Sequence, residues 1–256
     1  MARYYDLDLL SEPGDLGLYL RLAAEAHGPI LELAVGSGRL AVPLAAAGGD
    51  VTGVDNDVAM LDRARAKWQP NSATGRLTLI ERDLTTLALE QRYALVLLAL
   101  NSLLLLHGRA AQARALRVMR AHLAPGGRAV VDVWLPKSED LALYDGRRVL
   151  EWLRTDTTTG ERIAKTTIAN YEAATHSATL ITIFDAARLD EAERRITRED
   201  VISFITKDDL VAAANDAGLK PETIAGDYDL SPWSEASERV VLVLRDIESA
   251  GGRTSI

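Results

Sequence analysis

The feature that most constrains the fold of this chain is a glycine-rich turn between an apolar run and an alanine-rich segment. Ile30–Val35 is the apolar run, Gly36-Ser37-Gly38 is the turn, and Leu40–Ala47 is predicted to be a helix. Glycines let a backbone approach a ligand closely, because no Cβ atom stands in the way. The free amides at the start of the next helix then face that ligand. A plain strand-to-helix turn has the same pattern, so the turn needs further support.

Strands and helices alternate through the first half of the chain. Tyr93–Ala99 is almost continuously apolar, as is typical of a parallel strand buried on both faces. The alternation predicts an α/β fold, a Rossmann-like sheet with helices on both faces. Further strands are expected at Asp50–Val54, Leu77–Ile80 and Arg128–Trp134, helices at Val58–Lys67 and Ala110–Leu123, and a turn at Pro125-Gly126-Gly127.

The pattern changes after Pro136. Four segments rich in Thr, Ile, Val and aromatic residues predict an antiparallel β meander inserted into the α/β domain. They are Val149–Thr155, Arg162–Tyr171, Thr179–Ala187 and Arg194–Ile205. A helix from Thr206, ended by Gly218, and strands at Leu219–Ala225 and Arg239–Arg245 follow. We therefore assign residues 1–136 and 206–248 to the core, 137–205 to the insert and 249–256 to a frayed tail.

Two carboxylates follow successive strands of the predicted sheet. Asp55 ends the strand after the glycine turn, and Asp83 follows the next one. A carboxylate at the first position can accept hydrogen bonds from ribose hydroxyls. Either residue alone reads equally well as a helix cap or a turn residue. Because the carboxyl ends of parallel strands line one crevice, both together favour a nucleotide-binding site.

Composition excludes several classes of protein. The chain has no cysteine, which excludes disulfide scaffolds, Cys-ligated metals and thiol nucleophiles. Its net charge of −8 argues against a nucleic-acid partner. The longest nearly apolar stretch, Tyr93–Leu106, is too short to cross a membrane, and the first residues do not resemble a signal peptide. We expect a cytoplasmic protein with no membrane or nucleic-acid partner.

These motifs, in this order, resemble the class I S-adenosylmethionine-dependent methyltransferases. The resemblance covers nearly the whole chain and is strongest over residues 28–135. It includes Leu31-Glu32-Leu-Ala-Val-Gly36-Ser-Gly38-Arg39, Val51-Thr-Gly-Val-Asp55, Arg82-Asp83-Leu84, Asn101-Ser-Leu and His122-Leu-Ala-Pro-Gly-Gly127. It implies a seven-stranded sheet and S-adenosyl-L-methionine as cofactor. The position of the insert is similar to that in bacterial small-molecule methyltransferases, including sugar N-methyltransferases.

The resemblance also implies roles for particular residues. Glu32 and the turn with Ala34, Gly36 and Gly38 would hold the methionine part of the cofactor, and Asp55 would bind the ribose. The remaining cofactor contacts would come from Asn56, Met60, Asp83, Leu84 and Ala99. The chain departs from the family where Ala34 replaces a glycine, Ala94 an aspartate and Leu105 a histidine. Ala34 would either be tolerated or weaken cofactor binding.

The acceptor side of the site is less defined by sequence. His107 is the candidate general base, with a surface loop residue as the alternative. Tyr5, Asn101, Trp134 and Tyr228 are the candidate substrate residues, and ordinary packing is the alternative for Trp134 and for the N-terminal tyrosines Tyr4 and Tyr5. No His and carboxylate cluster has the spacing of a metal site, so no metal is predicted.

The functional hypothesis is transfer of a methyl group to an N or O atom of a small-molecule acceptor. Three alternatives stay open from the sequence: an NAD(P)-dependent oxidoreductase, another reaction on the same cofactor fold, and a non-catalytic protein with that fold. The insert is expected to cover the acceptor pocket and to form a homodimer surface, with Trp152, Tyr171 and Phe184 as its apolar contacts. A subdomain that packs only on itself is the alternative.

Overall fold

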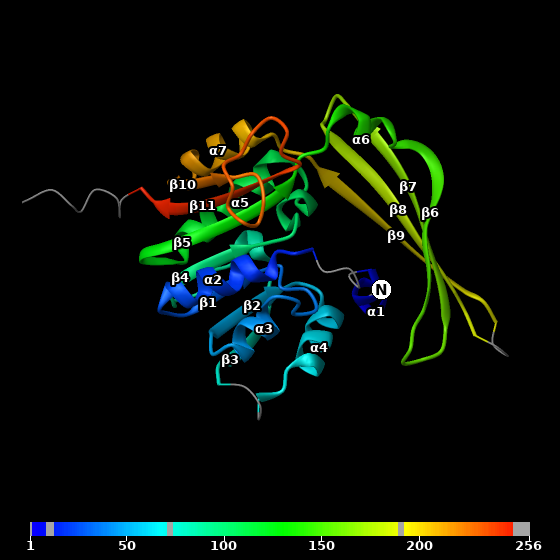
Figure 1. Cartoon of the computed structure of the whole chain (residues 1–256), viewed down its shortest axis with the longest axis horizontal. Helices are drawn as coiled ribbons and strands as arrows, with labels where there is room; N and C mark the ends of the chain where they lie inside the picture. Colours follow the sequence, from blue (N-terminus) through cyan, green and yellow to red (C-terminus); the bar gives the residue numbers. More distant parts are fainter. Residues whose placement is uncertain (1, 9–12, 71–73, 189–191, 248–256) are drawn as a thin grey trace, which may run out of the picture. The chain divides into compact units, whose positions relative to one another are not determined.

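A computed structural model describes residues 2–8, 13–70, 74–188 and 192–247 (Figure 1). Contacts divide these residues into two compact units. One unit, here called the core, contains residues 13–135 and the described residues from Ile205 onward; the other, the insert unit, contains helix α1 (Ala2–Asp8) and Pro136–Phe204. The sequence assigned α1 to the core, whereas its contacts are with the insert.

A seven-stranded sheet forms the centre of the core. Its order is β10-β11-β5-β4-β1-β2-β3, and β11 runs antiparallel to both of its neighbours while the other pairs are parallel. The strands are β1 (Ile30–Leu33), β2 (Asp50–Asp55), β3 (Arg76–Glu81), β4 (Tyr93–Leu98), β5 (Leu123–Trp134), β10 (Leu219–Ala225) and β11 (Arg239–Asp246). The predicted Rossmann-like fold is confirmed.

Helices and short 3₁₀ turns connect these strands. They are α2 (Leu16–Ala26), α3 (Ala41–Ala46), α4 (Val58–Lys67), η2 (Leu84–Thr86), η3 (Ser102–Leu105), α5 (Gly108–Ala121) and α7 (Lys207–Asp216). The sequence did not anticipate α2. The predicted start of α7 is confirmed, because the side chain of Thr206 accepts a hydrogen bond from the Asp209 amide. Such a cap satisfies one of the free amides of the first turn.

Strand β5 differs from the sequence prediction. Pro125-Gly126-Gly127 is not a turn before the strand but a part of it. Pairing with β4 shifts from Tyr93↔Leu123 to Leu95↔Arg128, and Gly126 takes a φ of +77°. Because β5 pairs with β4 both before and after the glycines, they form a register shift within one strand and do not end it. The strand then continues through a fully buried stretch, Ala129–Val133.

The insert unit contains the predicted four-stranded meander. Antiparallel strands follow the order β6-β7-β8-β9, with the short helix α6 (Ser138–Ala142) before them. The strands are β6 (Asp145–Thr155), β7 (Arg162–Glu172), β8 (Ser177–Ala187) and β9 (Arg194–Ser203). Each pairs with its neighbour in sequence, so this sheet is built from local hairpins.

Helix α1 packs on this four-stranded sheet. Tyr4 is buried and stacks on Phe184, with ring centroids 4.8 Å apart. The indole of Trp152 donates a hydrogen bond of 2.9 Å to Asp8. Tyr4 therefore packs in the apolar interior of the insert unit, which was the alternative to a role at the substrate. Trp152 and Phe184 contact each other within this unit, and Tyr171 lies against Phe204. Their role in covering an acceptor pocket or forming a dimer stays a prediction.

Within the described parts of the chain, no helix combines the length and the apolar character needed to span a membrane.

Candidate cofactor and acceptor site

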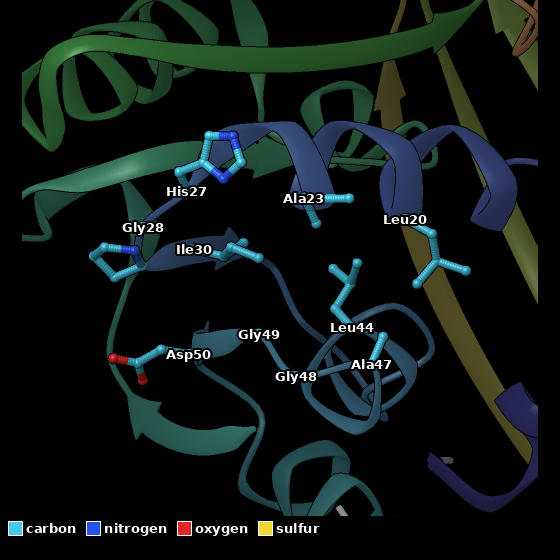
Figure 2. A pocket seen from close by; sticks show the side chains of 12 residues that line it. Leu20, Ala23, His27, Gly28, Ile30, Leu44, Ala47, Gly48, Gly49 and Asp50 are labelled. Atoms are coloured by element: carbon cyan, nitrogen blue, oxygen red, sulfur yellow. The ribbon is translucent and has the colours of Figure 1, made fainter. Parts of the chain in front are cut away.

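The core sheet has one edge formed by the amino ends of its parallel strands and another formed by their carboxyl ends, and the two differ in chemistry. At the amino ends of β1 and β2 a groove of about 480 Å³ is lined mainly by apolar and glycine residues, among them Leu20, Leu44 and Gly49 (Figure 2). Ile30 and Asp50, the first residues of these strands, also line it. The residues predicted to bind the cofactor follow the opposite, carboxyl ends of the strands. The groove is therefore separate from the candidate site.

The glycine turn after β1 has the conformation that its sequence suggests. Gly36 and Gly38 have φ values of +55° and +77°. A Cβ atom on Gly36 would meet nothing within 4 Å, whereas one on Gly38 would lie 2.9 Å from the side chains of Ala64 and Val42. Gly38 thus lets α4 pack against the turn, and Gly36 leaves open space above it. Ala34 also takes a left-handed φ of +55°, where glycine is the less strained residue.

Glu32 is a buried acid without a full set of partners. Its side chain lies in β1 and is 4% exposed, and among the described residues Oε2 has no hydrogen-bond partner. Burial raises the pKa of Glu32 to about 8, and nearby Arg39 opposes this shift. A buried carboxylate oxygen without a donor is suited to receive an ammonium group. The methionine amino group of S-adenosylmethionine is such a group.

Asp55 connects the end of β2 to the glycine turn. Its Oδ2 accepts a 2.8 Å hydrogen bond from the Gly36 amide, and its Oδ1 accepts one of 2.9 Å from the Asp57 amide. Asp57 in turn caps α4 by accepting from the amides of Ala59 and Met60. The carboxylate is half-buried and has further lone pairs for ribose hydroxyls. Glu32, the turn and Asp55 together fit the cofactor that the sequence suggested.

The other predicted cofactor contacts surround this group. Met60 and Ala99 are almost buried, while Asn56 is exposed at the end of β2. Asp83 is exposed and caps η2, which begins at Leu84, by accepting from the amide and hydroxyl of Thr85. The capping alternative is thus realised for Asp83. Its contact with adenine, like that of Leu84, stays a prediction.

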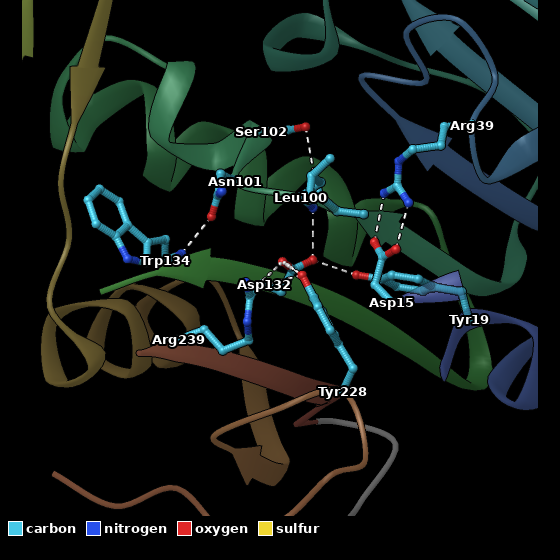
Figure 3. Close-up of polar contacts among 11 residues, drawn as sticks. Asp15, Tyr19, Arg39, Leu100, Asn101, Ser102, Asp132, Trp134, Tyr228 and Arg239 are labelled. Carbon is cyan, nitrogen blue, oxygen red and sulfur yellow. Dashed lines mark hydrogen bonds and ion pairs between the residues drawn. The ribbon is translucent and has the colours of Figure 1, made fainter. Parts of the chain in front are cut away.

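A second cluster, which we call the Asp132 cluster, lies near the carboxyl ends of β4 and β5 (Figure 3). Asp132 in β5 is fully buried, and its Oδ1 accepts hydrogen bonds from Tyr19 Oη (2.5 Å) and the Leu100 amide (2.9 Å). Its Oδ2 accepts from Tyr228 Oη at 3.0 Å and lies 3.4 Å from Arg239 Nη1. Burial raises the pKa of Asp132, and each of these four donors acts in the opposite direction by stabilising the carboxylate.

Sequence reasoning missed Asp132, Tyr19 and Arg239. The only signal in the sequence was Asp132 itself, a single acid in an otherwise apolar strand. It also missed the buried Asp15, which forms a bidentate ion pair with Arg39 at 2.6 and 2.7 Å. Partners of Asp132 come from more than 90 positions away in the chain, except Leu100. No local motif predicts such a contact.

The turn after β4 is strained and bound to β5. Leu100 and Asn101 have φ values of +50° and +63°. Asn101 Oδ1 accepts a 2.5 Å hydrogen bond from the Trp134 amide, and the Asn101 amide donates to the Asp132 carbonyl at 3.3 Å. The Ser102 hydroxyl donates to the Ala99 carbonyl at 2.6 Å. The structure thus brings Ala99, Asn101 and Trp134 together, as expected from the ends of neighbouring parallel strands.

The remaining candidates are placed separately. Tyr228 joins the Asp132 cluster from the loop between β10 and β11, and burial beside Asp132 raises the pKa of its hydroxyl. His107 is exposed immediately before α5, so its role as a base stays a prediction. Tyr5 is half-buried on α1 in the insert unit, and its contact with substrate likewise stays a prediction. In the described part of the chain, no three His, Asp or Glu side chains are grouped as they would be to hold a metal ion.

The fold and the carboxyl-edge acids define a Rossmann-like enzyme domain for a nucleoside-containing cofactor. Residues 30–127 match the methyltransferase domain family. The chain is 25% identical over 247 residues to the cypemycin N-terminal methyltransferase of a Streptomyces species, covering 93% of each protein. Residues 30–127 are thus a methyltransferase domain, and these similarities support an enzyme of small-molecule type that uses S-adenosylmethionine.

Solved structures agree with this assignment. The CcbJ methyltransferase from Streptomyces caelestis is 27% identical, with a TM-score of 0.73 over 93% of this chain and 95% of that one. The sugar N-methyltransferase KedS8 from a Streptoalloteichus species has the same fold, with 21% identity and a TM-score of 0.75 over 94% and 93% of the two chains. Of the alternatives left open by the sequence, these similarities disfavour the oxidoreductase.

Proposed function

We infer that this enzyme transfers the methyl group to the nitrogen of an amine on a small-molecule acceptor. The names of the relatives support this choice, because two of those described above are N-methyltransferases. The observation that carries it is the charge at the carboxyl edge of the core sheet. Four carboxyl groups, Asp15, Glu32, Asp55 and Asp132, lie among the residues described there.

Only two of these acids have a guanidinium partner in the described structure. Arg39 pairs with Asp15, and Arg239 pairs with Asp132. Glu32 and Asp55 therefore contribute negative charge when they are ionised. Negative charge raises the pKa of a nearby hydroxyl and disfavours the oxyanion that O-methylation needs. The same charge favours a group that becomes cationic during the reaction.

An amine acceptor fits these electrostatics. When bound, the cofactor supplies a methyl group on a sulfonium, and the nitrogen lone pair takes this methyl while the C–S electron pair remains on sulfur. The nitrogen gains the positive charge that sulfur loses, so the acidic edge retains a cation throughout. The residues of the edge have to orient the neutral amine in line with the methyl group, which can provide much of the rate acceleration. The product nitrogen then releases its proton to solvent.

The experiment is a methyl-transfer assay with matched acceptors. Each set offers the same carbon skeleton with an amino, hydroxyl or carboxyl group, and mass spectrometry identifies the methylated atom. We expect N-methyl products, with a rate that rises with pH as the acceptor ammonium loses its proton. Methyl ethers or esters as the main products would overturn the amine assignment and leave the methyltransferase assignment intact.

The homodimer and the cytoplasmic location stay parts of this proposal. Support for a dimer comes from β6, an edge strand of the insert sheet that exposes Leu150 (62%) and Leu153 (57%). Exposed apolar residues on an edge strand favour association. Light scattering after size exclusion measures the mass, and a Leu150→Lys, Leu153→Lys variant should then elute as a monomer.

A further inference from the structure

The Asp132 cluster joins three segments that are distant in sequence to one carboxylate. Tyr19 comes from α2, Leu100 from the turn after β4, and Tyr228 from the loop between β10 and β11. Arg239 at the start of β11 contacts both Asp132 Oδ2 and the Tyr228 hydroxyl. The guanidinium also lies over the Tyr228 ring, 4.3 Å from its centroid. The position of Tyr228 is therefore fixed at both its ring and its hydroxyl.

The same carboxylate also fixes the strained turn. Left-handed φ values at two successive non-glycine residues cost about 1–2 kcal/mol each, so Leu100 and Asn101 need external contacts to hold them. The Leu100 amide donates to Asp132 Oδ1, and the Asn101 amide donates to the backbone carbonyl of Asp132. One residue of β5 thus determines where this turn and Tyr228 lie.

The two carboxylate oxygens divide these tasks. Oδ1 serves Tyr19 and the Leu100 turn, and Oδ2 serves Tyr228 and Arg239. An asparagine has one acceptor oxygen and one donor nitrogen, so it can accept hydrogen bonds on only one side. If its oxygen keeps the turn, its amide nitrogen faces the guanidinium of Arg239, which only donates. Asparagine should therefore release the Tyr228 side while the turn is retained.

We propose that Asp132 is a positioning residue for the acceptor, because it fixes Tyr228 and the Leu100–Asn101 turn at the carboxyl edge of the sheet. This inference rests on the proposed function, which places the amine beside that edge. Asp132 is buried and does not itself touch the substrate. It acts through Tyr228, whose half-exposed side chain is available to the acceptor. The cofactor-binding residues Glu32 and Asp55 do not contact the cluster through any of these hydrogen bonds.

The test compares Asp132→Asn, Tyr228→Phe and the double variant with the wild type. Steady-state kinetics give kcat and the KM for an amine that the wild type methylates, and calorimetry gives the Kd for S-adenosylmethionine. Each single variant should lower kcat/KM for the amine at least about tenfold, the value expected when a hydrogen bond to a charged group is lost. The Kd for the cofactor should change less than about threefold. Asp246→Asn is the matched control, because Asp246 pairs with Arg120 at the other end of β11.

The double variant separates positioning from a general structural role. If Asp132 acts through Tyr228, the double variant should be no worse than the poorer single variant, since coupled residues are not additive. Additive losses, or a parallel loss of cofactor affinity, would overturn the proposal. If Asp132→Asn does not fold, Tyr228→Phe and Arg239→Gln decide alone, and unchanged amine kinetics in both would overturn it. A wild type that methylates no amine would instead reject the proposed function.

Discussion

The two halves of the carboxyl edge are held together in opposite ways. On the cofactor side, Asp55 and Asp83 bond to groups within two residues or to the neighbouring glycine turn, and Glu32 Oε2 has no donor among the described residues. On the acceptor side, Asp132 is saturated by donors from α2, the turn after β4 and the β10–β11 loop. The cofactor side thus keeps hydrogen-bonding capacity for a ligand, while the acceptor side uses it on the protein. Loss of an acid should cost affinity in the first half and stability in the second.

The largest effect should follow Asp132→Ala. Removal of this buried acid leaves Tyr19 without its acceptor and the guanidinium of Arg239 without its carboxylate partner. Breaking a buried charged pair in this way costs about 3–5 kcal/mol. Urea denaturation without cofactor measures the change in free energy of unfolding. Asp246→Ala, which removes a half-exposed ion pair, is the control and should cost less than about 1 kcal/mol. Equal costs for the two variants would contradict the contrast between the halves.

A smaller effect, on affinity, is expected for Asp55→Ala. The variant loses the acceptor for the ribose hydroxyls and loosens the Gly36 amide, so we expect S-adenosylmethionine binding to weaken by about 1.5–3 kcal/mol, or roughly 10- to 150-fold. Calorimetry measures the affinity, and circular dichroism checks the fold. Asp50→Ala, at the other end of β2, removes an exposed ion pair with Arg76 and should leave affinity unchanged. An unchanged affinity in folded Asp55→Ala would exclude Asp55 from the site.

Glu32 should make cofactor binding depend on pH. Because its pKa is raised to about 8 in the free enzyme, the carboxyl is protonated at lower pH and offers no charge to the cofactor's ammonium group. Affinity should therefore rise about tenfold between pH 6.5 and 7.5, and binding should release a proton. Calorimetry in buffers of different ionisation enthalpy measures both quantities. In Glu32→Gln the slope should disappear; a slope that persists there would assign the titration to another group.

The same shift acts on stability with the opposite sign. The folded chain keeps the Glu32 proton between the ordinary pKa of 4.5 and about 8, while the unfolded chain has released it. The folded state binds more protons in this window, so stability falls as pH rises. The stabilising contribution is complete below pH 4.5 and is lost as pH passes through 8. Urea denaturation of the free enzyme at several pH values, compared with Glu32→Gln, measures this contribution.

Ala34→Gly should have the smallest effect. Glycine relieves the left-handed conformation but adds freedom to the unfolded chain, so we expect a gain of about 0.5–1 kcal/mol. For a chain of this size this raises Tm by about 1–4 °C. Cofactor affinity should be at least that of the wild type. Clearly weaker binding in the folded variant would mean that the Ala34 methyl is itself part of the site.

The glycine turn and the strand-end acids were predictable because their signals are local. Glycines 36 and 38, Asp55 and Asp83 each follow a strand, and their partners lie nearby in sequence or on the next parallel strand. The same reasoning predicted Asn101 and Trp134, which lie together at the ends of β4 and β5. The meander was predictable for a similar reason, since each of its strands pairs with the next along the chain.

The contacts of Asp132 could not be predicted, because they depend on tertiary structure. Asp132 meets Tyr19 and Tyr228 only after α2 and the β10–β11 loop have packed on the sheet. The assignment of α1 to the core was wrong for the same reason, since the pairing of Tyr4 with Phe184 leaves no local pattern. Pro125-Gly126-Gly127 was read as a turn because glycine marks turns and strand irregularities alike.

Because β11 pairs with β5, the core sheet cannot be completed until the last strand of the chain has been synthesised. At the ribosome β5 emerges first, and its partner β11 follows about a hundred residues later, after the whole meander. At typical elongation rates this delay is about 5–20 s. The meander needs only contacts between neighbours and can form in that interval. During that time the apolar residues of β5 and its unpaired edge remain exposed. Binding of chaperones to the nascent chain should therefore be strongest while the insert is being translated.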